Sequence, residues 1–213
     1  MSDHRVWVHA WPEAAPLALA ALRSTPALAV IRIATPDTEM RHAAREQLRA
    51  ALRDLLAALL QQPAATLPLV AQPGQALVLD LPGTSIGLSV SHAPGLSVAA
   101  VHRYGPVGVD VMRIGERAGW MPDWEAVARD YLGPQAQARI NQVTPAQRAL
   151  AFAREWTALE ARLKCLGMAL TEWTPALQQR LATCTVTALD VPSGWWGAVA
   201  VPKDQGNQSS ACI

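Results

Sequence analysis

The sequence contains little lysine, little cysteine and no long uninterrupted hydrophobic run, although 51% of its 213 residues are hydrophobic. Arg, Gln or Pro interrupts each apolar run before it reaches the roughly 18 residues that a membrane-spanning helix requires. The three cysteines, Cys165, Cys184 and Cys212, are odd in number and have no metal-type spacing. This pattern argues against a disulfide framework or a zinc site and indicates reduced thiols.

No charge of one sign dominates the chain, whose formal net charge is +1. A strongly basic surface for nucleic acid and a strongly acidic tail are therefore not expected. The first residues also lack the basic segment and the apolar run that identify a secretory signal peptide. Together with the reduced cysteines, these features predict a cytoplasmic protein without a nucleic-acid or membrane partner.

The basic residues are nearly all arginine, and the only lysines are Lys164 and Lys203. Lys203 begins a polar segment, residues 203–213, whose composition predicts a disordered tail. Lys164 would then be the only lysine in the folded part of the protein.

Hydrophobic periodicity predicts short strands and two long helices. Leucines at helical spacing predict a helix over residues 40–62, and a second helix is expected over residues 144–165. A shorter helix is expected at residues 123–132, capped by Asp123 and ended by Gly133 and Pro134. Apolar or alternating segments predict strands at residues 6–11, 86–90, 96–102, 107–111, 185–191 and 195–201.

The order strand, long helix, strand, strand occurs in both halves of the chain. It predicts an α+β fold with two pseudo-duplicated subdomains, each with a long helix packed on a small antiparallel sheet. We expect an N-terminal subdomain at residues 1–105 and a C-terminal subdomain at residues 106–202. A cleft between such subdomains is a common place for a ligand.

Polar residues near two of these strands could carry chemistry. Ser91 and His92 follow one strand, where they could simply begin a turn. Asp110 lies within an apolar strand, and burying a carboxylate is costly unless it is paired, hydrogen-bonded or bound to a metal. Arg113 is a possible structural partner for that carboxylate.

The second long helix carries Trp156, Glu160 and Lys164 at intervals of one turn. Trp156 belongs to an apolar stripe with Phe152 and Leu163, so we interpret it as a packing residue. Glu160 and Lys164 alone could form an ordinary surface ion pair.

Three motifs follow one another in the chain: Ser89-Val90-Ser91-His92, Gly108-Val109-Asp110 and the segment from Trp156 to Lys164. Taken together, these motifs resemble the Sfp type of the 4′-phosphopantetheinyl transferase superfamily. The resemblance extends over residues 86–167. It implies an enzyme that transfers the 4′-phosphopantetheine group of coenzyme A to a serine of an apo acyl or peptidyl carrier protein. The reaction releases 3′,5′-ADP and depends on Mg²⁺. The resemblance also implies coenzyme A bound in the cleft between the two halves of a monomer.

The resemblance assigns roles to individual residues. Asp110 and Glu160 would bind Mg²⁺, which prefers hard oxygen ligands and can orient a diphosphate. Lys164 would contact the phosphates and, with Glu160, act in catalysis. Contacts with coenzyme A are implied for two further positions, the Ser91–His92 pair and Arg45 on the first long helix.

Four positions depart from the family pattern: Met112, Leu159, Gln75 and Gln135. Met112 stands where a third acid is common, Leu159 and Gln75 replace lysines, and Gln135 replaces a glutamate that acts as base in some members. Each change removes a charge from the expected site. Deprotonation would then fall to Glu160 or to a metal-bound water.

Two alternatives remain at this point. The first is a non-catalytic homologue that binds coenzyme A or a carrier protein without transfer. The second is an unrelated α+β protein in which Asp110 and Glu160 are structural and lie far apart.

Overall fold

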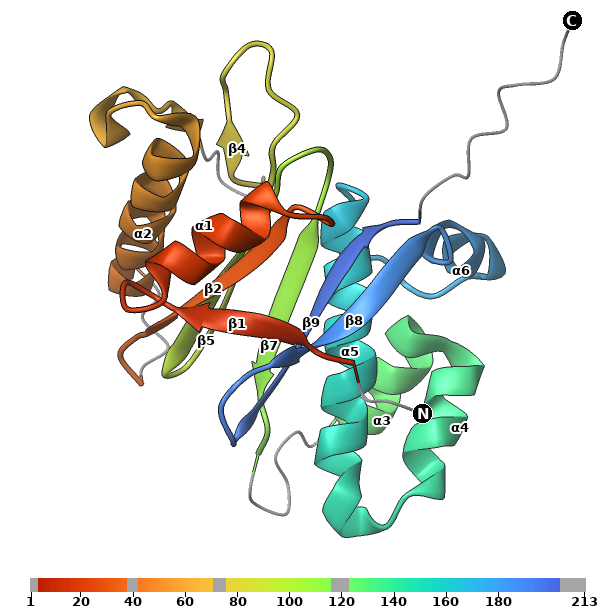
Figure 1. Cartoon of the computed structure of the whole chain (residues 1–213). Coiled ribbons are helices and arrows are strands. Elements are labelled where there is room, and N and C mark those ends of the chain that lie inside the picture. Colours follow the sequence, from red (N-terminus) through yellow and green to blue (C-terminus); the bar gives the residue numbers. More distant parts are fainter. Residues whose placement is uncertain (1–3, 38–41, 71–75, 116–122, 204–213) are drawn as a thin grey trace, which may run out of the picture.

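A single sheet connects the two halves of the chain in the computed structural model, which describes residues 4–37, 42–70, 76–115 and 123–203 (Figure 1). Within these residues the sheet has seven strands in the order β5-β6-β2-β1-β8-β9-β7. Neighbouring strands are antiparallel, except that β1 runs parallel to both β2 and β8. The strands are β1 Val6–Ala10, β2 Leu28–Ala34, β5 Gly87–Ala93, β6 Leu96–His102, β7 Gly108–Arg113, β8 Cys184–Asp190 and β9 Trp195–Pro202.

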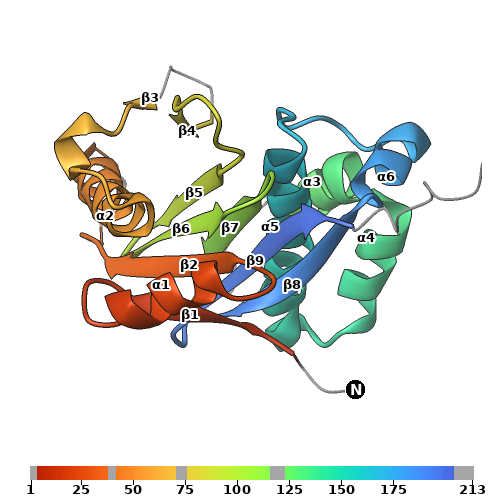
Figure 2. The same ribbon diagram turned by 45° about the horizontal axis from the view of Figure 1, so that its top comes forward.

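Helices from each half cover the strands of that half. Helices α1 and α2 lie beside β2, β5 and β6, whereas α5 lies beside β7, β8 and β9 with α4 and α6 around it (Figures 1 and 2). The helices are α1 Ala15–Arg23, α2 His42–Leu60, α3 Trp124–Val127, α4 Gly133–Gln142, α5 Arg148–Cys165 and α6 Pro175–Leu181. Short segments complete the fold: the 3-10 turns η1 Ala64–Thr66 and η3 Pro145–Gln147, the π-helical turn η2 Ala128–Leu132, and the strand pair β3 Leu69–Val70 and β4 Val78–Leu79.

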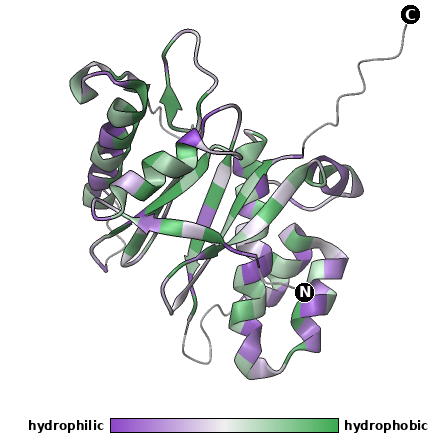
Figure 3. Ribbon diagram, in the orientation of Figure 1, coloured by the Kyte–Doolittle hydropathy of each residue, from purple (hydrophilic) through white to green (hydrophobic). Residues whose placement is uncertain are grey.

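The leucine pattern that predicts the first long helix also explains its packing. The buried side chains of α2 include Leu48, Leu52, Leu55, Leu56 and Leu59. They share one apolar cluster with Leu22 of α1 and Val101 of β6. Arg45 and Arg49 face solvent, and the helix shows alternating purple and green stretches (Figure 3). Helical spacing of large apolar residues buries one face and leaves the other face polar.

Alternate side chains of the strands pack into two different hydrophobic clusters on the two faces of the sheet. In β2, Ile31 packs with α1 and α2, whereas Val30 packs into a second cluster with Val98 of β6 and Val109 of β7. Successive side chains of a strand point to opposite faces of the sheet. Asp110, between Val109 and Val111, therefore faces away from this second cluster and toward α5, where it contacts Lys164.

Helix α5 lies directly against β7 because Gly108 has no side chain. A Cβ atom at this glycine would overlap the carbonyl oxygen of Ala161 and crowd the backbone nitrogen of Cys165. The close approach brings the polar residues of α5 within reach of Asp110. The glycine thus sets the distance between the two elements that carry the candidate site.

The structure confirms the α+β class and the predicted strands, and it revises three predictions. The expected short helix does not end at Gly133, because α4 begins there with Pro134 in its first turn and continues to Gln142. Proline lacks the backbone N–H that a first turn leaves unpaired, so it can begin a helix as readily as follow one. Asp123 forms no side-chain capping hydrogen bond. The two expected small sheets are parts of one sheet, joined through β1. The subdomain boundaries and the internal duplication stay predictions.

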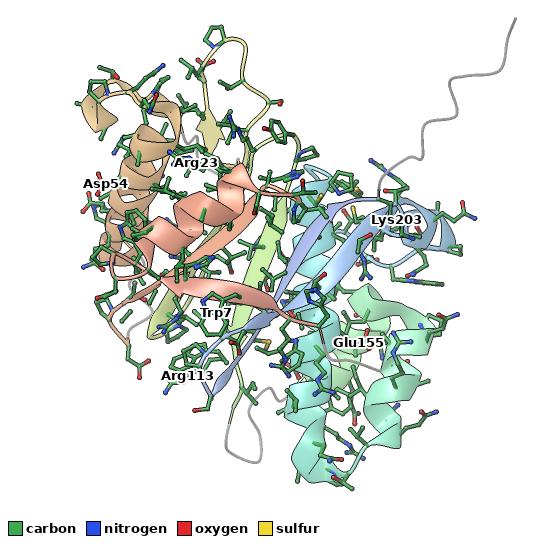
Figure 4. The ribbon with its side chains drawn as sticks, viewed as in Figure 1. Trp7, Arg23, Asp54, Arg113, Glu155 and Lys203 are labelled. Carbon is green, nitrogen blue, oxygen red and sulfur yellow. The ribbon has the colours of Figure 1, made fainter. Side chains whose placement is uncertain are left out.

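The structure revises the start of the predicted tail at Lys203. The backbone N–H of Lys203 donates to the carbonyl oxygen of Thr183 at 2.8 Å, so Lys203 belongs to the described fold (Figure 4). Lys164 is therefore not its only lysine. Residues 204–213 lie outside the described residues. In the part of the chain that the structure describes, no helix has the length and hydrophobicity needed to cross a membrane.

Candidate functional site

Asp110 is the centre of a polar cluster formed by three elements. Its Oδ1 atom accepts hydrogen bonds from the hydroxyl of Ser91 on β5 and from Nζ of Lys164 on α5, both at 2.8 Å. Lys164 also donates to the carbonyl oxygen of Val109 at 3.1 Å. The side chain of Asp110 is 10% exposed and that of Lys164 is 30% exposed. A buried carboxylate is thus paired with an ammonium group that still reaches solvent.

Two serine hydroxyls connect β5 with β7, the end strands of the sheet. Ser89 Oγ accepts from the backbone N–H of Val109 at 3.0 Å, and Ser91 Oγ accepts from that of Val111 at 3.2 Å. The sheet must curl for its two ends to meet in this way. The hydroxyls supply acceptors to the edge of β7, where no neighbouring backbone ladder exists.

This arrangement changes the interpretation of the serines. Ser91 is a buried residue inside β5, which continues to Ala93, so it does not begin a turn. Ser89 belongs to the predicted motif, but no role in the site was predicted for it. The signal that could have identified it is the spacing of Ser89 and Ser91, which places both hydroxyls on one face of a strand.

Glu160 lies on α5, one turn before Lys164, and is half-buried. Its pKa is raised, first by burial and second by the negative charge of Asp110, while the positive charge of Lys164 acts in the opposite direction. The two carboxylates are therefore close enough to repel each other. This contradicts the alternative in which Asp110 and Glu160 lie on separate surfaces.

The donor atoms in this cluster are those that a hard cation prefers. Two carboxylates against one ammonium leave one uncompensated negative charge, and carboxylate oxygens suit Mg²⁺ or Ca²⁺. Among the described residues, no group of three or more His, Cys, Asp or Glu side chains could hold a metal ion. Met112, at the position of a possible third acid, instead packs against the cluster that contains Phe152 and Leu159.

The other predicted site residues lie apart from Asp110. His92 Nδ1 is 2.8 Å from Ser97 Oγ, which donates to Thr35 Oγ1 at 3.3 Å. Because His92 follows Ser91 in a strand, the two side chains point to opposite faces. Arg45 is exposed on α2, which lies at the left of the molecule in both views, whereas α5 lies to the right of the central strands (Figures 1 and 2). The structure brings together Ser91, Asp110, Glu160 and Lys164, without His92 and Arg45.

The remaining sequence expectations have structural explanations. Trp156 is a packing residue, as predicted, and its ring stacks on Phe152 at 5.7 Å between centroids. Arg113 forms an ion pair with Asp37 and lies over the ring of Trp195. Gln135 lines a cavity on the opposite flank of α5 from Glu160. Gln75 lies outside the described residues.

Comparison with known families adds one finding. No curated protein matches this chain. Residues 106–193 match the model of the 4′-phosphopantetheinyl transferase superfamily. The matched segment begins just before β7 and contains Asp110, Glu160 and Lys164, but not Ser91 or Arg45. The part of the chain that holds the carboxylate cluster is therefore similar to this superfamily, and the similarity points to a transferase.

Proposed function

We propose that the protein is a Mg²⁺-dependent transferase of the Sfp type, which moves the 4′-phosphopantetheine group of coenzyme A to a serine of an apo acyl or peptidyl carrier protein. The observation that carries the proposal is the meeting of Asp110 with Glu160 and Lys164. Asp110 of β7 is far in sequence from Glu160 and Lys164 of α5, and all three lie within the segment that matches the superfamily.

Asp110 and Glu160 are the residues that would hold the divalent cation. When bound, Mg²⁺ supplies positive charge that neutralises and orients a diphosphate. The fit is supported by the half-buried Glu160, whose pKa is raised by burial and by the negative charge of Asp110. A second cation next to Lys164 would relieve the repulsion between the two carboxylates.

Ser91 and Lys164 have separate tasks in this proposal. The hydroxyl of Ser91 fixes Oδ1 of Asp110, so we assign Ser91 a positioning role instead of a phosphate contact. Lys164 is partly exposed, and its ammonium group would contact the phosphates as a point charge. The predicted contacts of His92 and Arg45 with coenzyme A stay predictions.

The transfer itself forms one bond and breaks one bond. The serine oxygen of the carrier attacks the phosphorus on the pantetheine side, and the bond from that phosphorus to the oxygen of 3′,5′-ADP breaks. The serine proton needs an acceptor near the reacting atoms. Glu160 is favoured over Gln135, because a carboxylate can accept a proton whereas a neutral amide is not a base, and because Gln135 lines the cavity on the other flank of α5.

The direct test is a mass measurement on the carrier protein. Incubation of the full-length protein with coenzyme A, Mg²⁺ and an apo carrier should add the mass of phosphopantetheine to the carrier. Asp110→Ala and Glu160→Ala should each abolish this addition, whereas Glu46→Ala, which removes an exposed acid on α2, should not. Transfer by a folded Asp110→Ala protein at the wild-type rate would refute the proposal.

One observation favours a second candidate function, a homologue that binds coenzyme A or a carrier but does not transfer. Met112 packs against an apolar cluster at the position of a third acid, so that among the described residues the cluster offers two carboxylates, Asp110 and Glu160, to a cation. This candidate predicts coenzyme A binding that is independent of Mg²⁺ and a carrier whose mass stays unchanged.

A further inference from the structure

A cavity of about 430 Å³ lies between α4, α5 and α6, on the flank of α5 that faces away from Glu160 and Lys164. Residues of α5 that line it include Arg154, Ala158 and Arg162, which recur at intervals of one helical turn. Since each residue of a helix is rotated by about 100° from the preceding one, Ala158 and Glu160 face nearly opposite directions. The cavity is therefore separate from the carboxylate cluster.

Arg162 is a half-buried cation that forms no ion pair with any acidic side chain in the described part of the chain. Its Nε atom is buried and has no hydrogen-bond partner. Its Nη1 atom lies 3.5 Å from the carbonyl oxygen of Ala158 in the same helix, which is long for a hydrogen bond. Burial also lowers the pKa of Arg162. Charged groups in such surroundings are normally paired, because desolvation of an unpaired charge is costly.

The one acidic side chain in the cavity wall is already paired. Glu155 accepts two hydrogen bonds from Arg139 of α4, at 2.7 Å and 2.9 Å. This bidentate pair lies at the junction of α4 and α5, where Glu155 is visible (Figure 4). The geometry engages both carboxylate oxygens of Glu155 with Arg139, while Arg162 feels the negative charge of Glu155 without a hydrogen bond to it among the described residues.

The cavity wall combines positive charge with apolar surface. Arg139, Arg154 and Arg162 against Glu155 leave two uncompensated positive charges. Arg154 also lies over the ring of Trp196, 4.5 Å from its centroid, which holds its guanidinium in place. The remaining wall is largely apolar or aromatic and includes Leu132, Ala136, Leu181 and Trp173.

We infer that this cavity binds a small organic oxyanion, with a carboxylate or phosphate head group on Arg162 and an apolar body against the surrounding side chains. A guanidinium offers parallel N–H donors that match an oxyanion, and Arg162 lines the cavity. The volume lies within the range of small-molecule sites. The inference does not depend on the proposed transferase activity, because neither Asp110 nor Glu160 lines the cavity.

The test uses the full-length protein and three probes in an NMR titration at pH 7. Benzoate and phenyl phosphate carry the two head groups, and benzamide is a neutral molecule of nearly the same shape as benzoate. The indole N–H resonance of Trp173 reports on the cavity wall. We expect at least one anion to shift this resonance, and benzamide to bind about tenfold or more weakly. The anion that binds better identifies the head group.

Two substitutions test whether anion binding depends on Arg162 itself or on the positive charge of the protein in general. Arg162→Met keeps most of the side-chain length and removes the charge, so it should weaken anion binding by about tenfold or more and leave the melting temperature unchanged or higher. Arg180→Met removes an exposed charge from the neighbouring helix α6 and should retain wild-type affinity. Equal affinity of Arg162→Met and wild type would overturn the inference.

Two further results bear on the inferred anion site. If Arg162→Met fails to fold, the wild-type titration alone decides, and an unshifted Trp173 resonance at saturating probe would overturn the inference. Asp110→Ala should bind the anion as wild type does. Loss of transfer in that variant with retained anion binding would show that the two sites are independent.

Discussion

Ser91 uses both hydrogen-bonding capacities of its hydroxyl group. It donates its proton to Asp110 at 2.8 Å and accepts the backbone N–H of Val111 at 3.2 Å. Ser89, two residues earlier, only accepts from the backbone N–H of Val109. The two serines therefore share one role, joining β5 to β7, and only Ser91 also orients the carboxylate.

We predict that Ser91→Ala and Ser89→Ala differ in their effect on the Mg²⁺ concentration that transfer requires. Each removes an acceptor from a buried N–H, so each should lower the free energy of unfolding by about 1–3 kcal/mol. Only Ser91→Ala should also raise the Mg²⁺ concentration needed for half-maximal transfer. Urea unfolding and Mg²⁺ titrations of activity measure the two effects. An equal Mg²⁺ requirement in both variants would contradict a positioning role for Ser91.

Glu160 makes stability depend on pH in a direction opposite to that of most carboxylates. Its folded-state pKa is raised by burial and by Asp110, so the folded state holds the proton more tightly than the unfolded state does. The associated stability is present at low pH and is lost as pH rises through the folded-state pKa. Above its folded-state pKa and without a divalent cation, ionised Glu160 thus makes the fold less stable than protonated Glu160 does.

We therefore predict that Glu160→Gln stabilises the cation-free protein at pH 7 and has little effect at pH 4. Urea unfolding with a chelator at both pH values measures the difference. Added Mg²⁺ should stabilise the wild type and not the variant, because binding to the folded state shifts the unfolding equilibrium. A variant that is less stable than wild type at pH 7 would show that Glu160 is held by favourable contacts instead.

At the scale of elements, the packing of α5 on β7 determines the candidate site. Gly108 permits this packing, since a side chain there would meet Ala161 and Cys165 of the helix backbone. Helix α5 carries Glu160 and Lys164, so a displacement of the helix would move both residues relative to Asp110.

We predict that Gly108→Ala lowers the free energy of unfolding by about 1–3 kcal/mol, because backbone atoms cannot move aside as a side chain can. The same variant should lose Mg²⁺-dependent transfer. Gly105→Ala is a suitable control, because a Cβ there would make only ordinary contacts of 3.6 Å and 3.7 Å with the ring of His102. Urea unfolding of both proteins provides the comparison, and equal stabilities would show that α5 can shift without cost.

Elements with strong local patterns were predictable from the sequence, and contacts between distant elements were not. The spacing of Leu48, Leu52 and Leu55 is sufficient to predict α2 and its buried face. Helix α4 was missed because Gly133 and Pro134 give the same local signal at the end of one helix and at the start of the next. The link from Ser89 to β7 depends on the curl of the whole sheet, which no local pattern encodes.

The candidate site also combines residues that could be predicted from the sequence with contacts that could not. Asp110 stood out because a carboxylate in an apolar strand needs a partner, and Glu160 and Lys164 stood out as a pair one turn apart. Their proximity to Asp110 was inferred from a family resemblance, since nothing in the spacing of distant segments specifies it. The half-buried Arg162 carried no sequence signal at all, because its environment arises from three helices.

At the scale of the whole molecule, the two halves share one interior. Val30 and Val98 come from the first half, Val109 and Val199 come from the second, and all four belong to one buried cluster. Strand β1 also pairs with β2 on one side and with β8 on the other. Neither half can bury its share of this interior without the other.

We therefore predict that the protein unfolds in one cooperative transition, although the sequence suggests two subdomains. Calorimetry should give equal calorimetric and van't Hoff enthalpies, which is the signature of an all-or-none transition. Val98→Ala, a change confined to the first half, should lower the single transition temperature and not split the transition, because the cavity it leaves is also lined by the second half. Two resolved transitions, with only one of them displaced in Val98→Ala, would instead show that each half has an independent core and that the link between β5 and β7 contributes little.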